Sequence, residues 1–305
     1  MNRALALLAV LIAPSIAGDF YGKDAEDAYG KDPSLERLAQ SQTIANKNLS
    51  IGTPVQVGGV TIYPVIDETA PKLVSSEIDG FSEAMADGSL QVSEVNTDSA
   101  NGGNHTTLQL TNHSKEPVLV MAGEVVRGGR QDRIFTEDLI IPPDAGPQMV
   151  QVHCVEKGRW SSEAETFSYG GRAELALLEA TAGGQDATWA AIAAMNTSRG
   201  GTSTGAYIAA SGAEMLQHRQ TLRTAIAQEH QVVGAVIAQG SEIVHAEIFG
   251  TPQLAEVGRS TLLDGYARDA VVMDDLEPIA PDPAAAARYL HSALSGSASL
   301  NLIGD

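Results

Sequence analysis

The sequence predicts an α+β fold, with a strand-rich front half and a helix-rich back half. In the front half, short runs alternate apolar and polar residues between Gly, Pro and Asn, a pattern typical of antiparallel strands in a sheet or sandwich. The back half opens with stretches whose apolar residues recur every three or four positions, as in amphipathic helices. Two apolar runs separated by Gln239-Gly240-Ser241 then indicate a buried β-hairpin.

The same patterns place the individual elements. The predicted strands of the front half are residues 60–65, 107–110, 117–126, 134–141 and 149–155, with a helix at 75–86. The back half has predicted helices at residues 173–181, 186–195, 205–229 and 255–268, and the hairpin strands at 232–238 and 243–249. In the longest of these helices, Ile208, Met215, Leu222 and Ile226 form one apolar stripe.

The two ends of the chain differ from this body, which we expect to span residues 48–273. Residues 1–17 are a predicted signal peptide, because Arg3 precedes nine apolar residues and the small residues Ser15 and Ala17 follow. Residues 18–47 form an acidic, weakly hydrophobic leader. Residues 274–305 are a proline-rich linker and a terminal helix at 284–294. We therefore expect export to the periplasm or the cell exterior, without a membrane-spanning segment.

Composition excludes several classes of function. The 305 residues include 38 Asp and Glu against 19 Lys and Arg, a net charge of −19, which argues against nucleic acid as a partner. One cysteine excludes an internal disulfide and a multi-thiolate zinc site. The seven histidines show no metal-ligand spacing and no loop resembles an EF-hand, so neither a metal nor a cofactor is expected. The sequence does not indicate an oligomeric state.

Positive charge is concentrated in one segment, residues 121–160. This segment holds five of the 19 basic residues, about twice an even share, namely Arg127, Arg130, Arg133, Lys157 and Arg159. A small anionic molecule would meet the least repulsive surface of the protein here.

Strand periodicity adds two carboxylates to this segment. Glu124 continues the alternate apolar residues from Val118, and Glu156 continues those from Val150, so both acids are predicted to face the core from neighbouring strands. Buried carboxylates are costly unless they are paired, and the nearest guanidinium groups are those of Arg127, Arg130, Arg133 and Arg159. Two interpretations stay open: an ion-pair network that only fixes a loop, and a preorganised polar pocket.

The same segment carries a family resemblance. The run from Gly123 to Arg133, the residues Ile140-Ile141-Pro142-Pro143, and the run from Cys154 to Trp160 resemble a family named for its association with ADP-ribosylglycohydrolase and rhodanese-like phosphatase proteins. The similarity extends over about residues 74–270. It implies that the polar core positions of the family are Glu124, Gln131, Arg133, Glu156 and Trp160. The name of the family implies a neighbourhood with ADP-ribose or related nucleotide chemistry.

Two other constellations are weaker. Cys154 follows His153, but consecutive strand residues face opposite sides, so Cys154 is expected to be a buried small hydrophobe rather than a nucleophile. Gly201-Thr202-Ser203-Thr204-Gly205 matches the pattern of a nucleophile elbow, which makes a serine hydrolase acting through Ser203 a minor alternative. That motif requires a preceding strand, whereas the residues before it are predicted to be helical.

We therefore predict a soluble exported protein that binds a small anionic ligand. In its most specific form, the prediction is that this ligand resembles ADP-ribose or a nucleotide. Glu124 and Glu156 would orient guanidinium groups or serve as acid and base. Arg127, Arg130, Arg133 and Arg159 would bind the anion, with Gln131 and Trp160 beside it, and Gly128 and Gly129 would let the backbone approach. The alternative is a noncatalytic surface or assembly module in which these acids and arginines only hold strands together.

Overall fold

The structure is a computed structural model that describes residues 48–70, 78–95, 105–144, 146–161, 165–276, 282–296 and 298–303. The predicted signal peptide, the leader and the first part of the predicted helix at 75–86 lie outside the described residues. No helix in the described ranges combines the length and the apolar character that crossing a bilayer requires.

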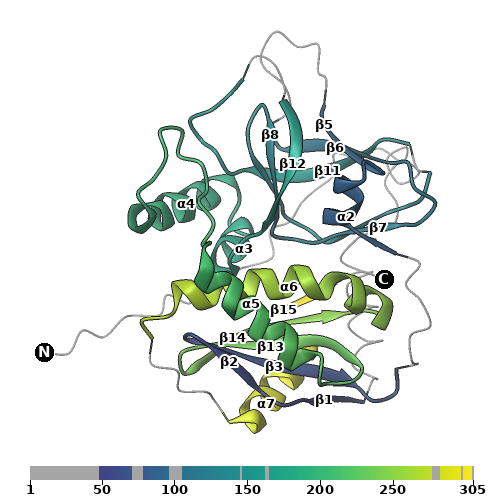
Figure 1. Cartoon of the computed structure of the whole chain (residues 1–305), viewed down its shortest axis with the longest axis vertical. Coiled ribbons are helices and arrows are strands. Elements are labelled where there is room, and N and C mark those ends of the chain that lie inside the picture. The colour runs from purple at the N-terminus through teal and green to yellow at the C-terminus, as the bar shows by residue number, and fades with distance from the viewer. Residues whose placement is uncertain are drawn as a thin grey trace, which may run out of the picture. The chain divides into compact units, whose positions relative to one another are not determined.

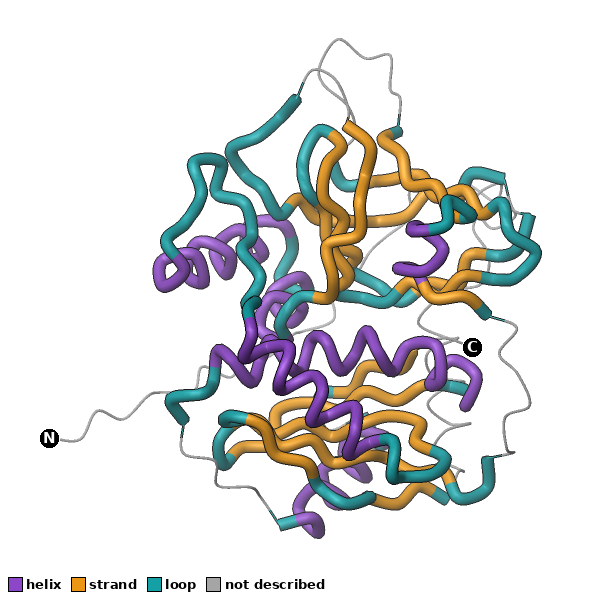
Figure 2. Tube along the Cα trace, viewed as in Figure 1, coloured by secondary structure: helices purple, strands orange, loops and turns teal. Residues whose placement is uncertain are grey.

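One sheet combines the two ends of the described chain (Figures 1 and 2). Its strands follow the order β1-β3-β13-β14-β15, and β2 pairs with β3. The bounds are β1 Leu49–Ile51, β2 Val55–Val57, β3 Val60–Asp67, β13 Val232–Gln239, β14 Glu242–Phe249 and β15 Leu300–Ile303. All pairs are antiparallel except β14 with β15. The predicted hairpin is confirmed, and it lies at the centre of this sheet.

Helices cover both faces of this sheet. Helices α5 (Ala213–Ile226) and α6 (Pro252–Val272) pack on one face, where Met215, Leu222 and Ile226 join the largest apolar cluster. Helix α7 (Pro283–Leu294) buries Ala286, Leu290 and Ala293 against the other face. Helix α7 packs on this sheet and β15 is one of its strands. The C-terminal segment therefore belongs to the same fold as the hairpin.

A second sheet has the order β12-β8-β9-β11-β6-β5. Its strands are β5 Leu90–Glu94, β6 Thr107–Asn112, β8 Glu124–Gly129, β9 Arg133–Phe135, β11 Gln148–Cys154 and β12 Glu165–Arg172. The edge strands β5 and β12 approach each other, so the sheet curls into a nearly closed barrel. A short sheet of β10 (Leu139–Ile141), β7 (Val118–Val120) and β4 (Asp79–Gly80), with α2 (Phe81–Ala86), closes its apolar core.

Two further helices, α3 (Leu175–Thr181) and α4 (Gln185–Arg199), follow the barrel in sequence. Leu177 and Ile192 pack with Val125 and Ile134 of the sheet and with Val155, which directly follows β11. The α+β class is therefore confirmed, with antiparallel pairing in nearly every strand pair.

Several predicted boundaries are wrong for local reasons. The predicted strand at 117–126 is broken at residues 121–123, where Gly123 has φ +87°, and the one at 134–141 is broken between β9 and β10. The predicted helix at 205–229 begins only at Ala213, because Gly205 and Gly212 have positive φ and Ala206 instead forms a β-bridge with Glu156. Ile208 is consequently not part of the helical stripe.

Candidate functional site

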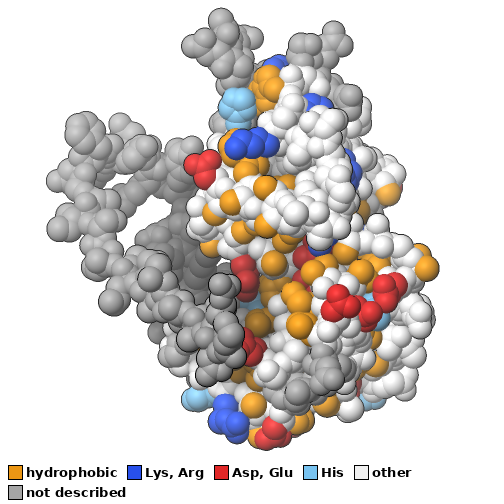
Figure 3. All heavy atoms as spheres, turned by 90° about the vertical axis from the view of Figure 1, so that its left-hand side faces the viewer, with side chains coloured by type: hydrophobic (Ala, Val, Ile, Leu, Met, Phe, Trp, Pro, Cys, Tyr) orange, Lys and Arg blue, Asp and Glu red, His pale blue; other side chains and the backbone are white. Residues whose placement is uncertain are grey.

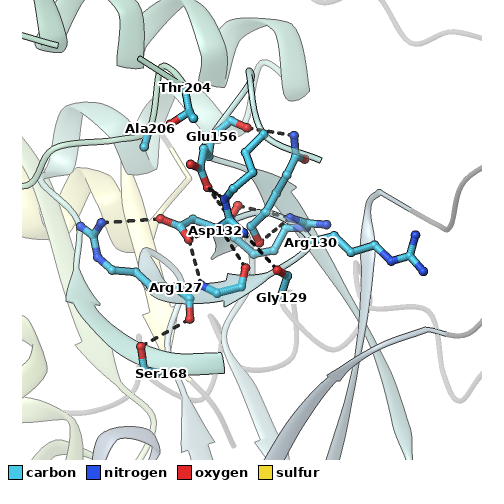
Figure 4. A network of polar contacts seen from close by, with 12 residues as sticks. Arg127, Gly129, Arg130, Asp132, Glu156, Ser168, Thr204 and Ala206 are labelled. Atoms are coloured by element: carbon cyan, nitrogen blue, oxygen red, sulfur yellow. Dashed lines mark hydrogen bonds and ion pairs between the residues drawn. The ribbon is translucent and has the colours of Figure 1, made fainter. Parts of the chain in front are cut away.

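The turn that joins β8 to β9 is defined as residues 128–133, which include the adjoining ends of both strands, and the side chain of Arg159 holds it. Figure 4 shows Asp132 and Glu156, two of the acceptors in this network. Arg159 Nε donates to Glu156 Oε2 at 2.6 Å, and its Nη2 donates to Asp132 Oδ1 at 2.9 Å. The same guanidinium donates to the carbonyl oxygens of Gly128 at 3.2 Å and Gly129 at 3.1 Å. Arg159 thus has a protein acceptor at each of its three nitrogens, which makes it a structural clamp on the turn.

Backbone contacts complete this clamp. Gln131 donates from Nε2 to the carbonyl oxygen of Glu156 at 2.9 Å, and the Gly158 N–H donates to Thr204 O at 2.6 Å. Asp132 Oδ1 accepts a second hydrogen bond from the Gly128 N–H at 2.9 Å. Burial raises the pKa of Asp132 despite that hydrogen bond and the nearby arginines. The side chains of Glu156 and Gln131 therefore stabilise the turn.

Gly128 and Gly129 are required by this turn itself. They have φ of +113° and +54°, which side-chain-bearing residues rarely adopt. A Cβ at Gly128 would lie 2.5 Å from Thr166 O, and one at Gly129 would lie 2.1 Å from Phe167 Cζ. Their small size therefore allows close packing against β12, rather than the approach to a ligand that the sequence suggested.

The outer side of the turn presents a different group, centred on the indole ring of Trp160. The guanidinium carbons of Arg130 and Arg133 lie 5.4 and 5.8 Å from the ring centroid, and the His105 ring lies 4.1 Å from it. The Arg130 side chain has no acidic partner among the described residues, and Figure 4 shows it pointing away from the clamp. Arg127, 40% exposed, lies 3.6 Å from the Asp132 carboxylate that Arg159 already holds.

Arg133 is the buried member of this group. Its side chain is 0% exposed, and its Nη1 donates to the carbonyl oxygen of Gln131 at 2.6 Å. Glu94 lies 3.6 Å from Nη2, but neither Nε nor Nη2 has a hydrogen-bond partner in the described part of the chain. A fully buried guanidinium with two unsatisfied nitrogens is unusual, because buried polar atoms are nearly always bonded.

Glu124 lies outside this group, although it is buried as predicted. Strand β9 separates β8 from β11, so the predicted neighbouring strands are not adjacent, and Glu124 and Glu156 lie at opposite ends of β9. Glu124 accepts hydrogen bonds from the Met121 N–H at 2.7 Å and the Tyr169 hydroxyl at 2.9 Å, not from an arginine. Burial raises its pKa to about 8. The two acids therefore make separate sets of contacts, Glu124 with Met121 and Tyr169 and Glu156 with Arg159.

Charge is distributed unevenly around the Trp160 group. Among the described side chains on and beside the turn at residues 128–133, five are basic (Arg127, Arg130, Arg133, Lys157 and Arg159) and three are acidic (Glu94, Asp132 and Glu156). Lys157 lies over a second indole, that of Trp189, at 4.8 Å. On the face shown in Figure 3, basic side chains lie mainly over the upper part and acidic ones mainly over the lower part. The concentration of basic residues that the sequence showed in residues 121–160 is thus found around this turn.

The structure also contains polar features that sequence reasoning missed. A pocket of about 530 Å³ lies between α5, α6 and α2, and it is lined by Arg219, Arg223 and Arg259 as well as Glu83, Glu256 and Asp264. Glu214, His218 and Asp274 form a separate cluster of possible metal ligands. The Glu214–His218 spacing of one helical turn was visible in the sequence, but its third member follows a different helix.

The structure also describes the surroundings of Cys154 and of Ser203, the two weaker constellations of the sequence. Cys154 is buried, and its Sγ donates to His105 O at 3.3 Å, whereas His153 Nδ1 contacts the Thr188 hydroxyl at 2.9 Å. The two side chains thus diverge, as strand alternation predicted. Ser203 lies in a turn that follows α4 rather than a strand, so the context of a nucleophile elbow is lacking there.

These features define an α+β protein whose curled sheet carries a clamped, glycine-containing turn beside an arginine-flanked tryptophan. A family profile described as the ARG and Rhodanese-Phosphatase-superfamily-associated Protein domain matches residues 48–300. The chain belongs to that family, as the motifs of residues 123–160 predicted. No curated protein and no solved structure matches the chain.

Proposed function

We propose that this protein binds a small anionic ligand, nucleotide-like in character, on the outer side of the turn at residues 128–133. The observation that carries the proposal is the pair of incompletely paired guanidinium groups, Arg130 and Arg133, beside the Trp160 ring. An indole offers a stacking surface for a nucleobase, and guanidinium groups bind phosphate oxygens in a bidentate manner.

The polar residues around this turn fall into two groups, those that hold the turn and those left free to contact a ligand, and this supports the proposed site. Arg159, Asp132, Glu156 and Gln131 satisfy one another and hold the turn, so they provide rigidity rather than ligand contacts. Arg130 is left without an acidic partner among the described residues, on a rigid turn that reduces the entropic cost of ordering it around an anion. Arg127 extends from the other side of the clamp toward Asp132 (Figure 4). The proposed binding residues are therefore Arg130 and Trp160, and the fully buried Arg133 adds positive charge beside the ring.

The proposal is tested by isothermal titration of the full chain with ADP-ribose, with inorganic pyrophosphate and adenosine as the separate halves of its chemistry. Arg130→Gln is expected to weaken ADP-ribose binding by about tenfold or more, because a hydrogen-bonded charge pair is lost. The matched control is Arg288→Gln, an exposed arginine on α7 that should leave the affinity unchanged. Absence of binding at millimolar ligand, or equal effects of both variants, would overturn the proposal.

A second candidate function is a noncatalytic surface or assembly module. The observation that favours it is the saturation of Arg159 by protein acceptors, which gives the clamp a purely structural explanation. Under this alternative, none of the three probes binds, and Arg130→Gln changes neither stability nor any ligand affinity. The same titration therefore separates the two functions.

We also propose that the protein is exported and that its mature chain begins at Gly18, on the evidence of Arg3 and the apolar residues that follow it. Mass spectrometry of the protein recovered from the periplasm and medium of a bacterial host tests this proposal. A product that retains residues 1–17 and stays in the cytoplasm would contradict it.

A further inference from the structure

A cluster of three side chains, two on helix α5 and one just after helix α6, has the composition of a metal site. Glu214 and His218 lie one turn apart near the start of α5, so both project from the same face of that helix. Asp274 follows the end of α6, which packs beside α5. One ligand atom from each of the three side chains lies within 4.8 Å of the other two.

The histidine supplies an independent observation. His218 Nε2 is buried and has no hydrogen-bond partner among the residues that the structure describes, although the residue as a whole is half-buried. A buried imidazole nitrogen is nearly always hydrogen-bonded, and the described residues supply no such bond here. A metal ion bound to the imidazole would account for the environment of this side chain.

Charge leads to the same conclusion. The carboxylates of Glu214 and Asp274 approach each other within the cluster, and like charges at that separation repel. The described residues provide no ion pair to either acid. A divalent cation would neutralise both carboxylates and would join the start of α5 to the end of α6.

From these observations we propose that Glu214, His218 and Asp274 bind a divalent transition-metal ion. An imidazole with two carboxylates suits Zn²⁺, Co²⁺ or Mn²⁺, whereas Ca²⁺ and Mg²⁺ are bound through oxygen ligands. Three protein ligands leave at least one position for water or a further ligand. The site is separate from the Trp160 group and does not depend on the proposed anion binding.

The experiment is a titration of the metal-stripped full chain with Zn²⁺ by calorimetry, repeated with Co²⁺ by visible absorption. One equivalent is expected to bind, and His218→Ala and Asp274→Asn should each weaken Zn²⁺ binding by about tenfold or more. A ligand-field band of bound Co²⁺ should diminish in the same variants. Binding should also weaken on acidification, because metal ligands must be deprotonated.

Two matched controls make the test specific. Asp275→Asn removes the carboxylate next to Asp274, and His291→Ala removes an exposed histidine on α7, so both should retain the wild-type affinity. Circular dichroism of each variant checks folding, and Glu214→Gln offers a third ligand change at an exposed position. Absence of saturable Zn²⁺ binding, selective binding of Ca²⁺, or equal losses in controls and ligand variants would overturn the proposal.

Discussion

Arg172 and Glu247 form a buried, bidentate ion pair that joins the two large sheets. Arg172 ends β12 of the curled sheet, and Glu247 lies in β14 of the other, with Nη1 and Oε2 3.2 Å apart and Nη2 bonded to Oε1. Arg172 Nε also donates to Ala122 O at 3.2 Å, and the Tyr266 hydroxyl bonds to Glu247. Burial acts against the charged form of Glu247, but the Arg172 guanidinium, with His245 and the Tyr266 hydroxyl, lowers the pKa of Glu247 below its usual value.

Removing one member of this pair should destabilise the protein strongly. Glu247→Gln leaves a buried guanidinium without its counter-charge, and we expect a loss of about 3–5 kcal/mol in the free energy of unfolding. Urea unfolding followed by circular dichroism measures this loss. The matched control is the exposed pair Arg219–Asp264, with side chains 46% and 23% exposed, where Asp264→Asn should cost about 1 kcal/mol or less. Similar losses at the two pairs would contradict the buried role.

Glu124 should make stability depend on pH in the opposite direction from an ordinary paired acid. Its pKa rises from an ordinary value of 4.5 to about 8 through burial, so the folded protein holds this proton where the unfolded chain has lost it. The resulting stabilisation is complete below pH 4.5 and is lost as the pH rises through 8. We expect wild type to lose stability relative to Glu124→Gln between pH 5 and 8, by up to about 1.4 kcal/mol per pH unit.

Unfolding curves at several pH values measure this difference. Glu242→Gln, at the exposed start of β14, is the control, and its profile should parallel that of wild type. Parallel profiles for Glu124→Gln and wild type would show that Glu124 is ionised in the folded protein and would contradict the prediction.

The contrast between Glu124 and Glu156 shows how far the sequence could lead. Local alternation predicted that both acids are buried, because the period of a strand is carried by its own residues. Their separation depends on β9 lying between β8 and β11, which is a matter of strand order that no local pattern encodes. The partner of Arg172 lies 75 residues away, and the sequence likewise gave no sign of it.

Secondary structure could likewise be predicted where local sequence patterns specify it, and not where pairing with distant residues does. The hairpin and the helices from Ala255 and Ala284 were predictable because long apolar runs and regular periods specify them. The short strands β1, β2, β4 and β5 were missed, as were β12 and β15. β12 contains Gly170 and Gly171, and β15 has only four residues, so each is stabilised by its neighbour in the sheet rather than by its own composition.

Arg159 should resist replacement even by lysine. Its three nitrogens serve Glu156, Asp132 and two backbone carbonyls at once, and a lysine ammonium cannot reproduce that planar arrangement. We expect Arg159→Lys to lower the free energy of unfolding by roughly 1–3 kcal/mol. Arg127→Lys is the control, because that side chain makes one long, exposed ion pair and should change stability by about 0.5 kcal/mol or less. If both variants lose the same amount, the clamp is not what holds the turn.

Cys154 should be chemically silent in the folded protein. Its thiol is 2% exposed, and burial raises its pKa, so little reactive thiolate is available at neutral pH. We expect iodoacetamide at pH 7.5 to leave the native chain unmodified and to add one carbamidomethyl group in urea, as measured by intact mass. A Gln185→Ala variant provides the sensitive comparison. Gln185 bonds both the N–H and the carbonyl oxygen of Cys154 at 2.8 Å, so its loss should loosen this strand end and speed alkylation. Rapid modification of the wild-type native chain would instead mean that the end of β11 opens readily, and the thiol would then have to be reconsidered as a reactive group.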